Sequence, residues 1–115
     1  MINMLKPRER EYKVAWYLPD GENVEKRKRF RYKLVSEQER AYSQPIRNMV
    51  THRNSLVIQT NYMFPFEIGD KVFTDYECNN MFKISNRAKF IYKVNEQALG
   101  MVKHNPATYW VLELE

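Results

Sequence analysis

The chain has 115 residues and a formal net charge of +5, which suits one domain with a modest core and permits a polyanionic partner without requiring one. Its single cysteine, Cys78, excludes an intramolecular disulfide and therefore the disulfide-stapled secreted scaffolds, so we expect a reducing compartment. Charged residues near the start, and the lack of any run of roughly 20 apolar residues, predict a soluble, unprocessed protein with no membrane partner.

Residues 12–34 have the pattern of a β-hairpin. In EYKVAWYL, apolar and polar residues alternate with period two, as in a half-buried strand. Pro19 and Gly21 in the following PDGEN favour a turn. The alternation predicts that one face of the first strand carries Tyr12, Val14, Trp16 and Leu18.

The second strand of this hairpin contains the basic stretch KRKRFRYKL. Its register places Phe30 and Tyr32 on one face and a stripe of cations on the other, namely Arg27, Arg29, Arg31 and Lys33. Such a stripe suits a solvated face or an edge strand whose charges prevent edge-to-edge pairing. It also suits a nucleic-acid contact, since each cation could meet a phosphate. The sequence leaves both interpretations open.

Residues 36–53 change to a helical pattern. Ser36 with Glu39 three residues later forms a capping box, which predicts a helix start. Pro45 ends that helix or begins another turn, and Ile46, Met49 and Val50 then follow helical spacing. This helical insert is expected either to carry partner contacts or to close one end of the core.

The rest of the chain, residues 55–114, returns to strands. We predict strands in 55–60 and 68–74, an extended segment at 62–66, and a bulge or tight turn at Ser85–Asn86. The next long run should keep Phe82, Ile84, Ala88, Phe90, Tyr92 and Val94 on one side. A loop over 95–106, with one possible helical turn ended by Gly100, should precede a last strand whose inner face carries Trp110, Leu112 and Leu114.

Together these elements predict a single, mainly β domain over 1–115, with six or seven antiparallel strands forming a small barrel or sandwich with a short helical insert. Its parts are the hairpin 12–34, the insert 36–53 and the β remainder 55–114. The residues expected to be buried include Trp16, Phe30, Ile58, Val72, Phe82, Ile84, Phe90 and Trp110.

The residues that usually carry chemistry are present but lack the spacing that chemistry requires. His52 and His104 have no apparent orienting partner, and Cys78 lies among acidic residues that disfavour a thiolate. Asp70, Asp75 and Glu77 do not follow the spacing of a calcium loop, and no glycine-rich phosphate cradle is present. We therefore expect no catalytic residues, no cofactor and no metal, and so a protein that is not an enzyme.

One longer stretch resembles a known family. SLVIQTNYMFPFEIGDKVFTDYECNNMFKISNR combines an apolar strand, an aromatic segment, a Gly-Asp-x-Val motif and a strand containing Phe82 and Ile84. This pattern resembles the small head-to-tail connector proteins of tailed bacteriophages, the head-closure, stopper or head-completion group, and the hairpin around PDGEN is similar to theirs. The resemblance implies a barrel subunit of a homo-oligomeric ring beneath the portal, around the channel for double-stranded DNA. It also implies contacts with portal or adaptor and tail proteins, and a location in the virion, with host cytoplasm during assembly.

The resemblance suggests a role for the basic stripe. Because many phage channels present acidic groups to DNA so that it slides, contact with a protein neighbour is favoured for Arg27, Arg29, Arg31 and Lys33. The alternative function is a small barrel that binds single-stranded nucleic acid, in which the stripe and Tyr32 would follow the backbone of the strand.

Overall fold

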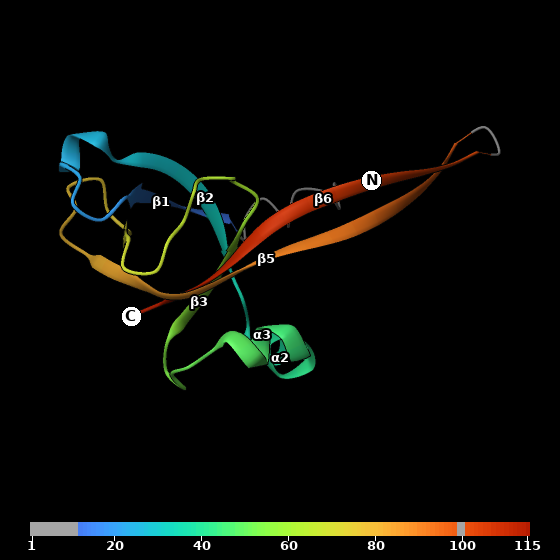
Figure 1. Cartoon of the computed structure of the whole chain (residues 1–115), viewed down its shortest axis with the longest axis horizontal. Helices are drawn as coiled ribbons and strands as arrows, with labels where there is room; N and C mark the ends of the chain where they lie inside the picture. Colours follow the sequence, from blue (N-terminus) through green and yellow to red (C-terminus); the bar gives the residue numbers. More distant parts are fainter. Residues whose placement is uncertain (1–11, 99–100) are drawn as a thin grey trace, which may run out of the picture.

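The fold is a closed barrel of six antiparallel strands, in the order β1-β2-β3-β6-β5-β4, with β4 pairing back to β1 (Figure 1). The computed structural model describes residues 12–98 and 101–115, with the backbone alone for 92–98 and 101–107. The strands are β1 (Tyr12–Leu18), β2 (Lys28–Leu34), β3 (Leu56–Thr60), β4 (Lys71–Phe73), β5 (Met81–Ala98) and β6 (Met101–Leu114). The prediction of a mainly β fold is confirmed, as a barrel and not a sandwich.

The helical insert begins where the capping box predicts. The Ser36 hydroxyl accepts a 3.1 Å hydrogen bond from the Glu39 N–H at the start of α2 (Glu37–Tyr42). Ser43 then caps α3 (Gln44–Met49), where Pro45 lies in the first turn, so this proline begins a second helix. A 3-10 turn, η1 (Val24–Lys26), precedes β2.

Two apolar clusters lie on opposite sides of the barrel wall. The interior cluster contains Ala15, Tyr17, Phe30, Tyr32, Ile58, Phe66, Val72, Ile84, Trp110, Leu112 and Leu114. The outer cluster contains Val35, Ile46, Met49, Val57 and Val111, so α3 covers the outside of β3 and β6. Val57 and Ile58 show the division, because neighbours on a strand point to opposite faces. The insert therefore packs on the side of the barrel and does not close its core.

The prediction that Trp16 of β1 is buried is wrong. Ala15 and Tyr17 point into the barrel, whereas Trp16 is only half-buried and lies outside, opposite Arg29 of β2. The pairing with β2 determines which residues of β1 point into the barrel. Ala15 lies opposite Phe30, and its small side chain leaves interior space for that ring. Both sets of β1 residues contain aromatic rings, so hydrophobicity alone could not choose between them.

A bulge between Ile84 and Asn86 reverses the facing of β5, as one alternative at Ser85–Asn86 predicted. Before it, Ile84 lies in the interior cluster, with Phe82 packed against that cluster. After it, Ala88 and Phe90 pack instead against the outer cluster. The prediction of one continuous apolar side is therefore wrong, because the extra residue exchanges the two faces.

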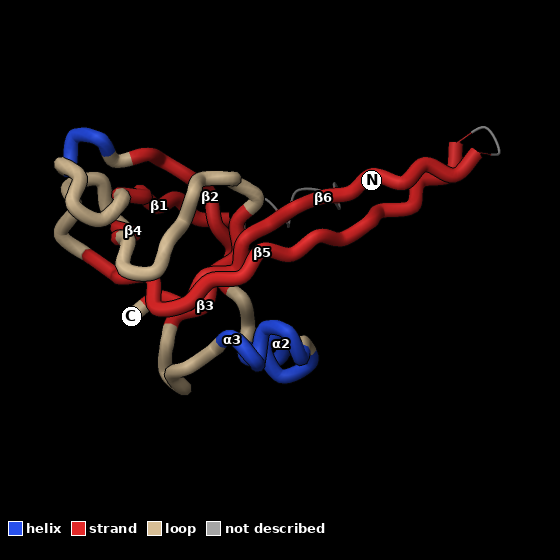
Figure 2. The backbone as a smooth tube through the Cα atoms, viewed as in Figure 1, coloured by secondary structure: helices blue, strands red, loops and turns tan. Residues whose placement is uncertain are grey.

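β5 and β6 continue well beyond the barrel as a two-stranded ribbon (Figure 2). Nine successive register pairs, from Phe90 opposite Tyr109 to Ala98 opposite Met101, have no third partner among the described strands. The predicted loop with a helical turn over 95–106 is therefore wrong, since the backbone there is strand. Gly100 lies outside the described residues.

The segment between β3 and β4 fills the barrel with aromatic rings. It is not a strand, as Pro65 predicted, and its Phe66 is fully buried. The Phe66 ring makes edge contacts with Tyr17, Phe30 and Trp110, at centroid distances of 4.7, 5.6 and 5.9 Å. The aromatic segment thus anchors the core.

Candidate interaction surfaces

The basic stripe is only partly continuous. Arg29 and Arg31 are exposed on the outer face of β2, while Lys33 on the same face is half-buried. Arg27 precedes the strand, and its guanidinium lies 3.9 Å from the centre of the Tyr76 ring and donates to the Val24 carbonyl at 2.9 Å. Two of the four predicted contact residues therefore form the exposed cationic pair, and one is held by an aromatic ring.

Arg31 borders two shallow hollows, which together form what we call the Tyr12 groove. One hollow, of about 400 Å³, is lined by Tyr12, Val14, Arg29 and Arg31. The other, of about 220 Å³, is lined by Tyr12, Arg31, Asn61 and Tyr62. Exposed tyrosine beside arginine is the composition enriched at protein interfaces, and it also provides stacking and phosphate contacts for nucleic acid.

A buried carboxylate organises the loops beside β1 and β4. Asp70 is 5% exposed and accepts hydrogen bonds from the Tyr17 hydroxyl at 2.6 Å and from the backbone N–H groups of Asp20 and Glu67, both at 2.9 Å. Burial, with the hydrogen bond to Asp70, raises the pKa of Tyr17 far above its ordinary value, so this hydroxyl stays protonated and donating. Asp70 thereby joins the turn after β1 to the aromatic segment.

A second buried carboxylate, Glu113 on the outer face of β6, holds the loop that follows α3. Its oxygens accept from the Thr51 N–H at 2.8 Å, the Thr51 hydroxyl at 2.7 Å, the His52 N–H at 2.9 Å and the Ser55 hydroxyl at 2.6 Å. Burial by itself would raise the pKa of Glu113, but the hydrogen bonds from Ser55, His52 and Thr51 lower it to about 2. The charged carboxylate is therefore the stable form in the folded protein.

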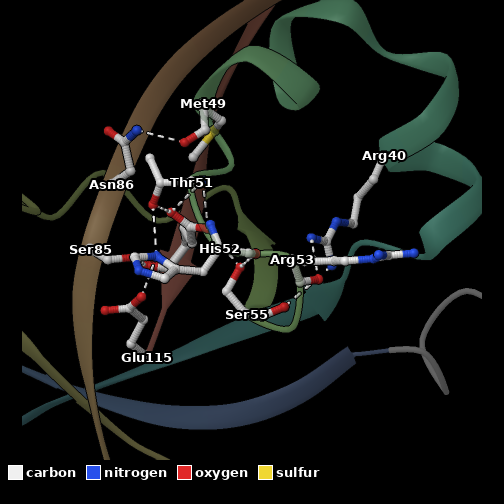
Figure 3. Close-up of polar contacts among 10 residues, drawn as sticks. Arg40, Met49, Thr51, His52, Arg53, Ser55, Ser85, Asn86 and Glu115 are labelled. Atoms are coloured by element: carbon white, nitrogen blue, oxygen red, sulfur yellow. Dashed lines mark hydrogen bonds and ion pairs between the residues drawn. The ribbon is translucent and has the colours of Figure 1, made fainter.

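Further polar contacts extend this network to both sides of the loop (Figure 3). The Asn86 amide, at the bulge of β5, donates to the Met49 carbonyl at 2.6 Å. The Arg40 guanidinium on α2 donates to the carbonyls of Ser55 and Arg53 at 3.2 and 3.4 Å. The loop 51–55 is thus fixed to the barrel on one side and to α2 on the other.

The side chains that could act in catalysis or bind a metal are the cysteine, the histidines and the acidic residues. Among the described residues no three His, Cys, Asp or Glu side chains gather as metal ligands. Cys78 lies in a turn whose Asp75 carboxylate accepts from the backbone N–H groups of Asn79 and Asn80. His52 pairs with Glu115 at the surface, and His104 lies where only the backbone is described. The Thr51 hydroxyl, which donates to the Glu113 carboxylate, lies 2.9 Å from the His52 Nδ1.

Within the described part of the chain, no helix is long and apolar enough to cross a membrane. Comparisons of the sequence with protein families and with curated proteins, and of the structure with solved structures, found no match.

Two features of these surfaces are not predicted by the sequence patterns. Glu113 lies in the alternating strand TYWVLELE, where a polar residue between leucines indicates a solvent-facing position, yet its side chain is fully buried beneath the insert. The ribbon is not predicted because NEQALGMVKHNP contains residues typical of loops.

Proposed function

We propose that this protein is a structural subunit of the head-to-tail connector in the neck of a tailed bacteriophage, where copies form a ring around the DNA channel. The observation that carries the proposal is the ribbon of β5 and β6, which projects from a closed barrel. It is supported by the resemblance of residues 55–85 to head-closure proteins and by the barrel fold which that resemblance implies.

The ribbon favours assembly for an energetic reason. A two-stranded hairpin is marginally stable in water by itself, because it leaves two edges unpaired and lacks a core. Here the Phe90 and Tyr109 rings stack at 5.4 Å where the ribbon leaves the barrel, and Ile91 beside them is 68% exposed. A neighbouring subunit that covers this base and pairs with an edge would supply the missing contacts. Ordering the ribbon then becomes part of subunit association.

The experiment shortens the ribbon without changing its register. Tyr92 lies opposite Ala107, so residues 93–106 can be replaced by an Asn-Gly turn, which closes a two-residue hairpin. The new turn is not placed next to the Lys93–Pro106 pair, because proline has no N–H to donate to the opposite strand. We expect the full-length protein to form oligomers at high concentration in sedimentation velocity, and the shortened variant to remain a folded monomer.

The control is the thermal unfolding of the shortened variant, followed by circular dichroism, which should keep a cooperative transition because both apolar clusters are retained. Assembly of the shortened variant to the same extent as the full-length chain would contradict the role of the ribbon. A full-length chain that stays monomeric, and does not join rings of portal or adaptor protein, would contradict the proposed function as a whole.

The second candidate function is binding of single-stranded nucleic acid, which the Tyr12 groove favours by placing two tyrosines beside Arg29 and Arg31. In that case the logarithm of the affinity for an oligonucleotide should fall with the logarithm of the salt concentration, by about 0.7 per neutralised phosphate. Tight, salt-sensitive binding by the monomer that is lost on R29E/R31E would support this candidate over the connector. Weak binding that the double reversal leaves unchanged would exclude it.

A further inference from the structure

The helical insert carries a second concave surface, which shares no lining residue with the Tyr12 groove. It has a volume of about 590 Å³ and is lined by Glu37, Arg40, Ala41, Arg47, Val50 and Arg53. Three guanidinium groups and one carboxylate give this lining a net formal charge of +2. We call it the insert groove.

The guanidinium groups of the insert groove have no carboxylate partner within the described residues. Arg40 donates to two backbone carbonyls, Arg47 contacts the side-chain oxygen of Gln44, and Arg53 is exposed. A planar guanidinium has five N–H donors in a fixed fork, so Arg40 can donate further hydrogen bonds in addition to these two. The groove therefore presents cationic donors whose charge is not neutralised within the fold.

The base of the groove is held rigidly. Glu113 accepts hydrogen bonds from Thr51, His52 and Ser55, and the carbonyls of Arg53 and Ser55 in the same loop accept from Arg40 (Figure 3). A chain of hydrogen bonds thus runs from the barrel wall to a guanidinium at the surface. Because a binding group that is already ordered loses little entropy when its partner arrives, this bracing favours recognition.

We propose that the insert groove is a docking site for an acidic segment of a partner protein. Carboxylates match the arginine forks, and the apolar side chains of Ala41 and Val50 suit the stems and apolar neighbours of such residues. A nucleic-acid strand fits less well, because the residues that line the groove include no aromatic ring on which a base could stack. The site is independent of the ribbon and of ring formation.

The test uses the full-length chain and a fluorescein-labelled peptide of repeated Glu-Glu-Leu triplets, followed by fluorescence anisotropy at low and at physiological salt. The double variant R47E/R53E should weaken binding by about tenfold or more, since reversing two exposed charges removes two ion pairs with the peptide and adds repulsion. R29E/R31E, with the same change in charge outside the insert groove, should leave the affinity within about twofold. Arg40 is kept, because its hydrogen bonds support the loop.

Two further measurements complete the test. Amide chemical shifts on adding the peptide should change most in residues 37–55, and the ribbon-shortened variant should bind the peptide as the full-length chain does. No peptide binding, or an equal loss in both double variants, would overturn the proposal. Tighter binding of single-stranded oligothymidylate, lost in R47E/R53E, would also overturn it and assign the groove to nucleic acid.

Discussion

At the scale of single residues, two buried carboxylates determine where the loops lie. Asp70 and Glu113 are 5% and 0% exposed, and each accepts hydrogen bonds from several backbone or hydroxyl donors. A buried charge is tolerated only when such donors replace the lost water. Each carboxylate is therefore a point on which the stability of its loop depends.

Glu113→Gln should destabilise the protein by about 2–3 kcal/mol, because the amide turns a donor toward groups that themselves donate. The effect should depend on pH. The pKa of Glu113 falls from 4.5 to about 2 on folding, so its contribution is present above pH 4.5 and is lost as the pH falls toward 2. Urea unfolding between these pH values should show the wild type losing stability that the variant never had.

The matched control is Glu77→Gln, which changes an exposed carboxylate and should alter the free energy of unfolding by less than about 0.5 kcal/mol. A pH profile of Glu113→Gln parallel to that of the wild type would contradict the assigned role of the carboxylate.

Tyr17→Phe should cost about 1–2 kcal/mol, because it removes the 2.6 Å hydrogen bond to the Asp70 carboxylate while leaving the ring packed in the core. Tyr32→Phe is the comparison: its ring lies in the same cluster, and no hydrogen bond from its hydroxyl is found within the described residues. Chemical denaturation of both variants measures the difference. Equal losses would show that the hydroxyl of Tyr17 contributes nothing beyond burial.

At the scale of elements, the helical insert depends on caps and tertiary contacts. Helices of six residues, as α2 and α3 are, are too short to be stable by themselves. Their stability comes from Ser36, Ser43 and the apolar contacts of Ile46 and Met49 with the barrel wall. The insert should thus open locally more readily than the strands.

Ser36→Ala should therefore cost about 1 kcal/mol and act locally, since it removes the acceptor for the Glu39 N–H. Hydrogen exchange should accelerate in residues 37–42 and remain unchanged in β3 and β6. Gln38→Ala, at an exposed position of the same helix, should leave exchange unchanged. Acceleration throughout the barrel would mean that the insert and barrel unfold together.

At the scale of the whole molecule, the chain is elongated and presents arginines on two separate surfaces. The chain extends 51 Å along its longest axis and 30 and 27 Å along the others, with the ribbon along the long axis (Figure 1). Exposed arginines line two separate surfaces, the Tyr12 groove and the insert groove. The proposed assembly between unlike neighbours would need more than one contact surface, and these two grooves could provide them.

R29E/R31E should leave the melting temperature almost unchanged, because exposed strand charges contribute little to stability. If these arginines meet a protein neighbour, the reversal should impair assembly onto a portal or adaptor ring, measured by co-sedimentation. Normal assembly by the folded variant would show that the stripe is not part of the contact surface.

Removal of divalent ions by a chelator should not change the melting temperature, because no cluster of metal ligands occurs within the described residues. Differential scanning fluorimetry with and without the chelator measures this. A clear fall in the melting temperature would reveal a structural metal and overturn the expectation.

The sequence by itself determined the features that depend on neighbours along the chain. The turn around Gly21, the Ser36 cap and the alternation in β2 and β6 each involve a few consecutive residues, and all occur as predicted. Five of the residues predicted to be buried are buried, because their positions follow the local alternation of their strands: Phe30, Ile58, Val72, Ile84 and Trp110. Phe82 and Phe90 are partly buried, on opposite sides of the wall.

Only the tertiary structure decided what depends on residues far apart. The phase of β1 follows from Ala15 meeting Phe30, and the reversal in β5 follows from the bulge at Asn86. Glu113 can be buried and charged because donors from residues 51–55, roughly sixty positions away, surround it. The length of the ribbon likewise depends on pairing between β5 and β6. These choices are energetic balances between distant groups, and a local pattern does not contain them.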